Sequence, residues 1–417
     1  MLPEIQKKLK NICCYLKNKG KGWIMRFKIH IKKEDIIWFF VLLAFLEPWW
    51  FITISGLDLL INIFKLCCGG YVFYKMIHDS IHVRSFFTLF AVYRGFIVIR
   101  TIMCGSPEWT AYLTESIQWL IYIYLLEILI VNKNRQIISI LTNILAVILF
   151  LNVITWTPNG LLLDPGQGYF LLGVRTRIAD VAIPAMGLFL FEKKLKKEKG
   201  FSFKGVIIFG SSILFFILEW VATGLVCTAL LIALYLILKN RKLSGFRDKV
   251  LIISSCGLTV GVVFFQIQEK FSWLLSGILQ KDISLTGRTE IWDVALAVIN
   301  KQLWFGYGYT NHGNFVALYD FVTSGHSQMI QVLYYGGIVG MVLFLVLLFS
   351  VVRKAIKAHY KEISILLCTF VVIVIETISE ICMDNLYFIT LLVVMEMSVY
   401  LKGEINVRKN QRHSSGI

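Results

Sequence analysis

Long runs of apolar residues, separated by short polar stretches, dominate the sequence. A helix that crosses a membrane takes about 20 residues, and most of these runs have close to that length. They lack the short alternating segments that are typical of a membrane β-barrel. The pattern therefore predicts an all-α integral membrane protein with about twelve transmembrane helices. The runs cover residues 36–54, 57–76, 85–104, 112–131, 137–155, 178–191, 203–220, 222–238, 250–267, 327–350, 363–379 and 386–401.

The polar segments divide the chain into five parts. A basic amino tail, residues 1–35, precedes helices 1–9, which lie within 36–267. A large outer loop, 268–326, separates helix 9 from helix 10. Helices 10–12 lie within 327–401, and residues 402–417 form a tail. No small-residue cleavage site precedes the first apolar run, which indicates a retained helix and not a signal peptide.

Two outer segments are too long to be simple helical hairpins. The first, near 156–177, is rich in Pro and Gly. The second is the loop 268–326, whose many aromatic residues argue against disorder. Loops this long are usually functional or disordered, so this one is expected to carry function. Within it, residues 290–302 carry apolar side chains at helical spacing, which predicts an amphipathic helix on the membrane surface.

Composition supports the assignment to the membrane. Apolar residues make up 57% of the 417 residues and charged residues 16%. Soluble domains carry about 45–50% apolar and about 25% charged residues, so an ordinary soluble enzyme is excluded. The nine cysteines contain no C-x-x-C pair, and most fall within apolar runs. Neither a zinc site nor a thiol redox site is predicted.

The net charge of +16 has a membrane explanation. With the amino terminus in the cytoplasm, cytoplasmic segments hold 33 Lys and Arg residues, outer loops hold 6, and 3 lie within the runs. This asymmetry follows the positive-inside rule. It predicts that both termini are cytoplasmic, and nucleic acid is not needed as a partner to explain the charge.

Three arginines run against this bias because they lie in outer segments: Arg175, Arg177 and Arg288. An arginine fork holds phosphate oxygens with two parallel hydrogen bonds, which suits a lipid-linked diphosphate. The alternatives are contact with a lipid headgroup or an ion pair with Glu290, Asp180 or Asp164.

Two further arginines, Arg94 and Arg100, lie within the run 85–104. A charge inside the membrane is costly and usually faces the bundle interior or a water-filled cavity. Arg100 is close enough to the outer end to snorkel. For Arg94, a ligand role competes with a structural ion pair to Glu115, Glu127 or Glu376. Acidic residues near outer helix ends, which sequence does not rank, are Glu47, Asp58, Glu108, Glu219, Glu376, Glu380 and Asp384.

His326 lies where the large outer loop re-enters the membrane. A neutral imidazole at that boundary can accept a proton from a sugar hydroxyl near neutral pH. The alternative is a histidine that caps the following helix. His312, in the same loop, is a second candidate. The outer loops offer no compact carboxylate or histidine cluster, so neither a metal nor a cofactor is predicted.

An ordered set of residues within about 65 positions carries a family resemblance. It begins with Gly-Arg-x-x-x-Trp, continues through an amphipathic stretch to Gly-x-Gly, and ends with His-Ser, a following Gln and two later glycines. The set resembles the signature of the O-antigen ligase and polymerase family of bacterial envelope glycosyltransferases, the Wzy and WaaL types. The family's usual proline before Gly-x-Gly is absent. The matching positions are Gly287, Arg288, Trp292, Gly306, Gly308, His326, Ser327, Gln331, Gly337 and Gly340.

The resemblance implies a GT-C-like, metal-independent glycosyltransferase at the outer face of the bacterial cytoplasmic membrane. His326 would be the general base, and Arg288 with Arg175 or Arg177 would bind the diphosphate of an undecaprenyl-linked oligosaccharide. Accessory roles are assigned to Arg94, Arg100, His312 and Trp292.

The expected reaction is polymerisation of repeat units of a capsule or O-antigen. One alternative is a ligase that transfers the finished chain to lipid A core. Another, of a different class, is a polysaccharide flippase. Besides the lipid bilayer, a chain-length regulator and a flippase are expected partners.

Overall fold

The computed structural model of the chain describes residues 33–78, 84–133, 135–162, 164–165, 168–198, 200, 202–239, 245–265, 288–310, 325–358, 362–398 and 400–401. It contains two units. The first ends at Trp38, and only residues 33–38, the start of helix α2, are described in it. The second begins at Phe39 and holds all the features below.

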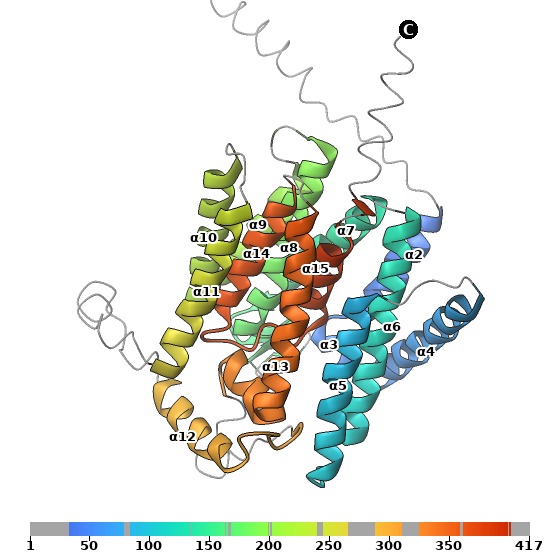
Figure 1. Ribbon diagram of the computed structural model, residues 1–417. Helices are drawn as coiled ribbons and strands as arrows, with labels where there is room; N and C mark the ends of the chain where they lie inside the picture. The colour runs from blue at the N-terminus through green and yellow to red at the C-terminus, as the bar shows by residue number, and fades with distance from the viewer. Residues whose placement is uncertain are drawn as a thin grey trace, which may run out of the picture. The chain divides into compact units, whose positions relative to one another are not determined.

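The structure is helical, and a helix lies on every apolar run of the sequence (Figure 1). The bounds are α2 Lys33–Phe45, α3 Trp49–Thr53, α4 Ser55–His78, α5 Ser85–Met103, α6 Trp109–Lys133, α7 Arg135–Ile154, α8 Ile178–Lys196, α9 Phe203–Leu218, α10 Ala222–Lys239, α11 Gly245–Phe265, α12 Arg288–Lys301, α13 Gln328–Lys357, α14 Ile363–Glu376 and α15 Leu386–Glu396.

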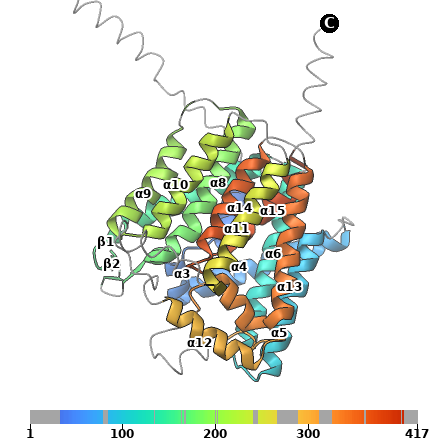
Figure 2. The ribbon, with the colours of Figure 1, turned by 60° about the vertical axis from the view of Figure 1, so that its left-hand side comes forward.

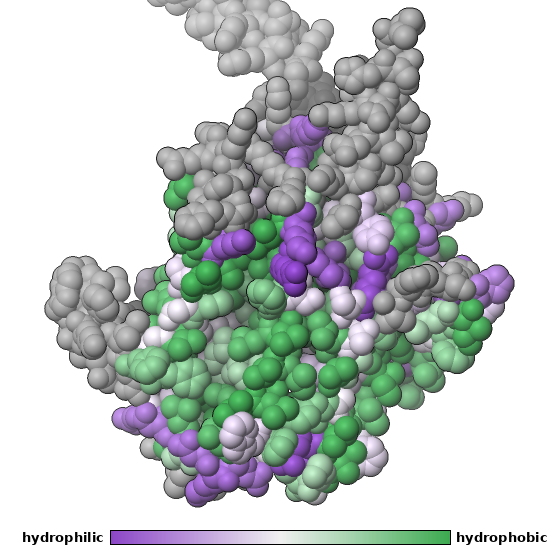
Figure 3. All heavy atoms as spheres, in the orientation of Figure 1, coloured by the Kyte–Doolittle hydropathy of each residue, from purple (hydrophilic) through white to green (hydrophobic). Residues whose placement is uncertain are grey.

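Five of the described helices are long and apolar enough to cross a membrane: Ser55–His78, Ser85–Met103, Trp109–Asn132, Arg135–Ile154 and Gln328–Lys357. Shorter apolar helices include α9, α10, α14 and α15. Hydrophobic residues cover the middle of the face in Figure 3, and hydrophilic residues gather toward α12. The prediction of a helical membrane protein is confirmed. The count of twelve spans and the likeness to the GT-C fold stay predictions.

The core of the bundle is built around α8 and α14. Nearly every residue of α8 from Ile178 to Glu192 is buried, as is most of α14. Helices α7, α9, α10 and α15 pack around α8, while α5 packs along α13 (Figure 2). By contrast, α4 exposes apolar side chains along its length, with Leu66 73% and Ile77 69% exposed. Such a surface is typical of a helix that faces lipid.

The first predicted run, 36–54, is not one helix. Helix α2 ends at Phe45, and the short α3 begins at Trp49 after Pro48. Because proline lacks an N–H and disfavours helical geometry in the residue before it, a helix usually ends there. The break brings Glu47 beside Lys65 of α4, with Oε1 and Nζ 2.5 Å apart.

The segment after α7 forms two small antiparallel sheets that the hydrophobic pattern does not predict. Strands β1 Trp156–Thr157, β2 Gly160–Leu161 and β3 Asp164–Pro165 form one, in the order β1-β2-β3. Strands β4 Tyr169–Phe170 and β5 Gly173–Val174 form the other. A short 3₁₀ helix, η1 Arg175–Arg177, then leads into α8.

The predicted amphipathic helix is present as α12. Its buried side chains are Trp292, Ala295 and Ile299, which lie on one face at spacings of three and four residues. Helix α12 packs against α13, so this face contacts protein. Location at a membrane surface stays a prediction for the rest of the helix.

Candidate active site

The loop of residues 377–385, between α14 and α15, anchors the site. The backbone N–H of Gln328 donates to the carbonyl of Thr377 at 3.3 Å, and the Ser327 hydroxyl donates to the same carbonyl at 3.2 Å. The Gln328 side chain accepts from the N–H of Met383 at 2.9 Å. The start of α13 and its preceding residue, Ser327, are therefore tied to this loop, and His326 comes directly before Ser327 in the chain.

Arg288 is the first residue of α12 and points to this loop. Its Nη2 donates to Oε1 of Glu380 at 2.8 Å. The Arg288 side chain is 21% exposed and that of Glu380 is 8% exposed. The ion-pair alternative considered for Arg288 is thus realised, but with Glu380 and not with Glu290, Asp180 or Asp164. Because the side chain keeps an exposed part, it remains open to a ligand.

Arg177 approaches the same loop from the start of α8. Its Nη1 donates to the carbonyl of Ile381 at 2.9 Å and to Oδ2 of Asp180 at 3.3 Å. Burial raises the pKa of Glu380, and the charges of Arg288 and Arg177 oppose that rise. The positive charges of the two predicted arginines therefore both lower the pKa of one carboxyl group, although 111 positions separate the arginines in the sequence.

His326 lies within electrostatic range of both arginines. Its pKa is lowered by burial first, and then by the positive charges of Arg288 and Arg177. A neutral imidazole is therefore favoured at physiological pH, which is the form that accepts a proton. The His326 backbone has φ of +44°, a left-handed conformation that is uncommon outside glycine. Strained backbone of this kind occurs often at functional sites.

Two signature residues hold the peptide just before His326. The indole Nε1 of Trp292, a fully buried side chain, donates to the carbonyl of Gly325 at 3.1 Å. The Gln331 side chain accepts from the N–H of Gly325 at 3.2 Å. Both polar groups of Gly325 are thus fixed by side chains, one from α12 and one from α13. This fixes the backbone from which the imidazole projects.

The Gly-x-Gly element is structural in this chain. Helix α13 is interrupted at Gly337, where φ is +60° and ψ is −156°. The interruption frees the carbonyls of Tyr334 and Tyr335, which accept from the N–H groups of Tyr307 and Gly308 at 2.8 and 2.9 Å. On the other side of the break, the N–H of Ile338 donates to the carbonyl of Leu303 at 2.9 Å. The Gly-x-Gly element and the residues before it therefore hydrogen-bond with backbone groups of α13 that the interruption leaves without a partner in the helix.

Close backbone approach explains why these positions are glycines. A Cβ on Gly306 would lie 2.6 Å from the carbonyl oxygen of Tyr334. A Cβ on Gly337 would lie 2.4 Å from the carbonyl carbon of Trp304. Both glycines also have positive φ, so no other residue fits without strain.

Arg94 is buried, 1% exposed, and its side chain contacts other residues of the fold. Its Nη2 donates to Glu115 at 2.7 Å and its Nη1 to Asp384 at 3.2 Å. The guanidinium also lies 3.9 Å from the ring centroid of Tyr112. The predicted ion pair with Glu115 is confirmed. Through Asp384, Arg94 also fixes the far end of the loop 377–385.

The remaining candidates lie elsewhere. Arg100 donates from Nη2 to the carbonyl of Gly306 at 2.9 Å and from Nε to that of Phe305 at 3.1 Å, which supports the Gly-x-Gly element. Arg175 is exposed and lines a pocket of about 510 Å³ with Glu219, beside the small sheets. His312 and Gly287 lie outside the described residues.

Glu380 and Asp384 are the site residues that sequence did not single out. Both appear among the acidic residues near outer helix ends, with no signal to rank them. Their position in a loop between two apolar helices is the one feature that could have drawn attention. Among the residues that the structure describes, no group of three or more His, Cys, Asp or Glu side chains is placed to hold a metal. Metal independence stays a prediction.

The fold and this cluster define a multi-pass helical membrane protein with a site built from two arginines, a histidine and a buried carboxyl group. Residues 205–345 match the model of the O-antigen ligase family, and they include most of α9, all of α10–α12 and the first part of α13. This match confirms the resemblance to the O-antigen ligase and polymerase family. No curated protein and no solved structure matches the chain.

Proposed function

We propose that the protein is a polysaccharide polymerase that joins oligosaccharide repeat units carried on undecaprenyl diphosphate. The observation that carries this proposal is the convergence of Arg288 and Arg177 on the loop 377–381, with His326 within electrostatic range of both arginines. The active site would face outward from the bacterial cytoplasmic membrane, since the positive charge of the chain is concentrated in the opposite segments.

The two arginines supply the positive charge and the hydrogen-bond donors that a diphosphate site needs. Each guanidinium presents a planar fork of donors that matches two phosphate oxygens. Arg288 is also the first residue of α12, so the free N–H groups and the dipole of that helix favour an anion beside it. Arg177 adds a second charge from a separate helix. In this proposal Arg175, which lines another pocket, is not part of the diphosphate site.

His326 would act as the general base. A hydroxyl oxygen of the acceptor sugar attacks the anomeric carbon of the donor, and the hydroxyl proton moves to the imidazole. The bond between that carbon and the diphosphate oxygen breaks, and undecaprenyl diphosphate leaves with the bonding electrons. The arginines stabilise the charge that grows on the leaving oxygen. One positioned base typically contributes about 10²–10⁴-fold, so orientation and diphosphate binding supply the rest.

A ligase is the second candidate because the matching family model is described as O-antigen ligase. Both reactions use the same attack and the same leaving group. They differ in the acceptor, which is a second lipid-linked repeat unit for the polymerase and lipid A core for the ligase.

The test uses the purified full-length protein in lipid nanodiscs with the lipid-linked repeat unit. A polymerase gives a ladder of products spaced by one repeat unit from this substrate alone. A ligase gives one product, and only when lipid A core is added. A flippase leaves the covalent structure of the substrate unchanged, which would overturn both transferase assignments.

Two substitutions connect the assay to the site. His326→Gln is expected to abolish product while the lipid-linked donor still binds, because an amide hydrogen-bonds but accepts no proton in this pH range. Arg288→Lys is expected to retain little activity, because a lysine keeps the charge but loses the fork. Normal product formation in His326→Gln would rule out the base assignment, and full activity in Arg288→Lys would reduce that arginine to a generic charge.

A further inference from the structure

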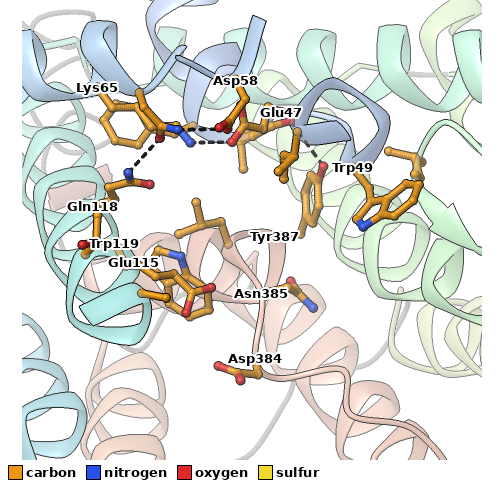
Figure 4. Close-up of a pocket in the computed structure, with 18 of the residues that line it drawn as sticks. Glu47, Trp49, Asp58, Lys65, Glu115, Gln118, Trp119, Asp384, Asn385 and Tyr387 are labelled. Carbon is orange, nitrogen blue, oxygen red and sulfur yellow. Dashed lines mark hydrogen bonds and ion pairs between the residues drawn. The ribbon is translucent and has the colours of Figure 1, made fainter. Parts of the chain in front are cut away.

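A second hollow lies at the carboxyl-terminal end of the loop 377–385. It has a volume of about 780 Å³, within the range of about 300–1,000 Å³ that is usual for ligand sites. Its walls come from five parts of the fold: the α2–α3 junction, the first turns of α4, the first turns of α6, Leu172 between β4 and β5, and residues 384–387. In Figure 4, Lys65, Asp58 and Glu47 lie along one side of the open space, and Glu115, Asn385 and Asp384 lie along the other.

The lining is acidic. Four carboxyl groups, those of Glu47, Asp58, Glu115 and Asp384, line the hollow together with a single lysine, Lys65. Even when the buried guanidinium behind Glu115 and Asp384 is included, acids outnumber cations by four to two. This balance is opposite to that expected for a diphosphate site. A phosphate or a sugar acid is therefore disfavoured here.

Amide and aromatic side chains complete the wall. Gln118 donates from Nε2 to Oδ1 of Asn62 at 2.9 Å, and Asn62 in turn donates to Asp58 at 2.9 Å. Trp49 is 37% exposed and stacks on Tyr169 with ring centroids 4.6 Å apart. Carboxylates and amides pair with hydroxyl groups, which are both donors and acceptors. The exposed face of an indole offers a flat apolar surface to the carbon face of a sugar ring.

Glu47 provides an independent sign of a missing partner. Its side chain is 9% exposed, and its Oε1 pairs with Lys65. Its other carboxylate oxygen, Oε2, is buried and has no hydrogen-bond partner among the residues that the structure describes. Buried polar atoms in folded proteins nearly always have a partner, so the incompletely paired Glu47 carboxylate in the pocket wall favours a ligand that brings hydrogen-bond donors.

We propose that this hollow binds the acceptor saccharide, and that it selects sugar units without anionic groups. The inference rests on the proposed function and adds the substrate class of the second site. An acyl chain is a poor occupant because it would leave these carboxylates and amides without hydrogen bonds.

The loop 377–385 connects the hollow to the reactive cluster, which consists of Arg288, Arg177, His326 and Glu380. Arg288 and Arg177 bind its first half at Glu380 and Ile381, and Arg94 binds Asp384 in its second half. Asp384 also lies within electrostatic range of Arg177. A saccharide in the hollow would therefore lie beside the cluster that holds the donor diphosphate.

The experiment measures binding of the sugar without its lipid carrier. The probe is the repeat-unit saccharide released by mild acid from the cell's own lipid-linked precursor, so that no diphosphate remains. Isothermal titration calorimetry with the full-length protein in nanodiscs gives its affinity. The matched probe is the same saccharide after oxidation of its primary alcohols to carboxylates. We expect saturable binding of the first probe and at least tenfold weaker binding of the second.

Variants of the wall locate the binding site. Trp49→Ala and Gln118→Ala are expected to weaken binding of the released saccharide at least tenfold, with unchanged melting temperature for Gln118→Ala. Trp109→Ala is the matched control, because Trp109 is 38% exposed, begins the same helix α6 and does not line the hollow. Arg288→Ala is expected to bind the released saccharide normally while losing transfer.

The outcomes separate this inference from the proposed function. No binding of the released saccharide, equal binding of the oxidised probe, or full affinity in Gln118→Ala would overturn the acceptor pocket while leaving the transferase intact. Saccharide binding that depends on Gln118, with no transfer from any lipid-linked donor, would support the pocket and count against the polymerase.

Discussion

The guanidinium of Arg288 and the carboxyl group of Glu380 lie 2.8 Å apart, Nη2 to Oε1, although 92 positions separate them in the sequence. The carboxyl group is nearly buried, so the pair is shielded from water more than a surface ion pair is. It holds the arginine in place before any substrate arrives. A diphosphate that uses the Nη2 donor of Arg288 must therefore compete with Glu380.

This competition predicts that Glu380→Gln strengthens anion binding. The amide keeps the shape of the side chain but removes the negative charge, so inorganic pyrophosphate should inhibit transfer at a concentration about three- to tenfold lower, a gain on the order of 1 kcal/mol. Inhibition curves on purified protein measure this. Glu290→Gln is the control, since Glu290 is exposed on the same helix and should change inhibition little. Weaker inhibition in Glu380→Gln would mean that Glu380 only orients the arginine.

The lowered pKa of His326 predicts the pH dependence of transfer. If the neutral imidazole is the base, the rate is constant at neutral and mildly alkaline pH and falls as acid protonates the ring, below the pH expected for an ordinary histidine. Arg177→Gln removes one of the positive charges that lower this pKa. The acid limb should then move to higher pH, because protonation of His326 becomes easier.

The measurement is the rate of transfer at saturating donor across the acid pH range, for the wild type, Arg177→Gln and a control variant, Arg175→Gln. Arg175→Gln removes the same charge from an exposed position in a different pocket and should leave the acid limb unchanged. An equal shift in both variants would mean that bulk charge, and not the local field at His326, sets the limb.

The sequence was sufficient to predict the helices and to single out Arg288, Arg177 and His326; both arginines lie within electrostatic range of His326 in the structure. Apolar runs report membrane helices directly, because backbone groups in lipid must be paired within a helix. The ordered spacing of Arg288, Trp292 and His326 pointed to one region. The partner of Arg288, Glu380, was not predictable, since its role depends on a contact between α12 and a loop far along the chain. The acidic hollow depends on five segments that are separate in the sequence.

Two local features were missed for different reasons. The strands between 156 and 174 are two residues long, too short for any alternation of polar and apolar positions to be visible. The Gly306-x-Gly308 element was part of the family signature with no stated partner. Its function follows from the interruption of α13 at Gly337, and sequence does not show that these two backbones meet.

That interruption predicts unequal tolerance at two glycines of the family signature. Gly337→Ala adds a Cβ where φ is +60° and the Trp304 backbone lies 2.4 Å away, so folding should fail or lose several kcal/mol. Gly340→Ala meets its nearest side chain, Phe96, at 3.5 Å, an ordinary contact. It should fold with a nearly unchanged melting temperature. Fluorescence-detected size-exclusion chromatography and thermal unfolding of both variants test this. Equal stability of the two variants would contradict the interruption of α13 at Gly337.

The hydrogen bond from Trp292 to Gly325 predicts a variant that separates positioning from folding. Trp292→Phe keeps a large aromatic ring in a fully buried site but leaves the Gly325 carbonyl without its indole donor. An unsatisfied buried acceptor costs about 1–3 kcal/mol, so the protein should fold with a lower melting temperature. Because His326 follows Gly325 directly, the imidazole should lose its alignment as well.

Turnover is therefore expected to fall by about 10- to 100-fold, since small displacements of a catalytic group have large effects on rate. Donor binding should remain within about twofold, because Arg288 and Arg177 are anchored to the loop 377–381 by their own contacts. The measurements are kcat, donor affinity and thermal unfolding on the same preparation, below the melting temperature of the variant. Trp304→Phe, at a side chain that is 63% exposed, is the control and should change none of them. A Trp292→Phe protein that loses stability but keeps full kcat would show that the indole supports the fold alone.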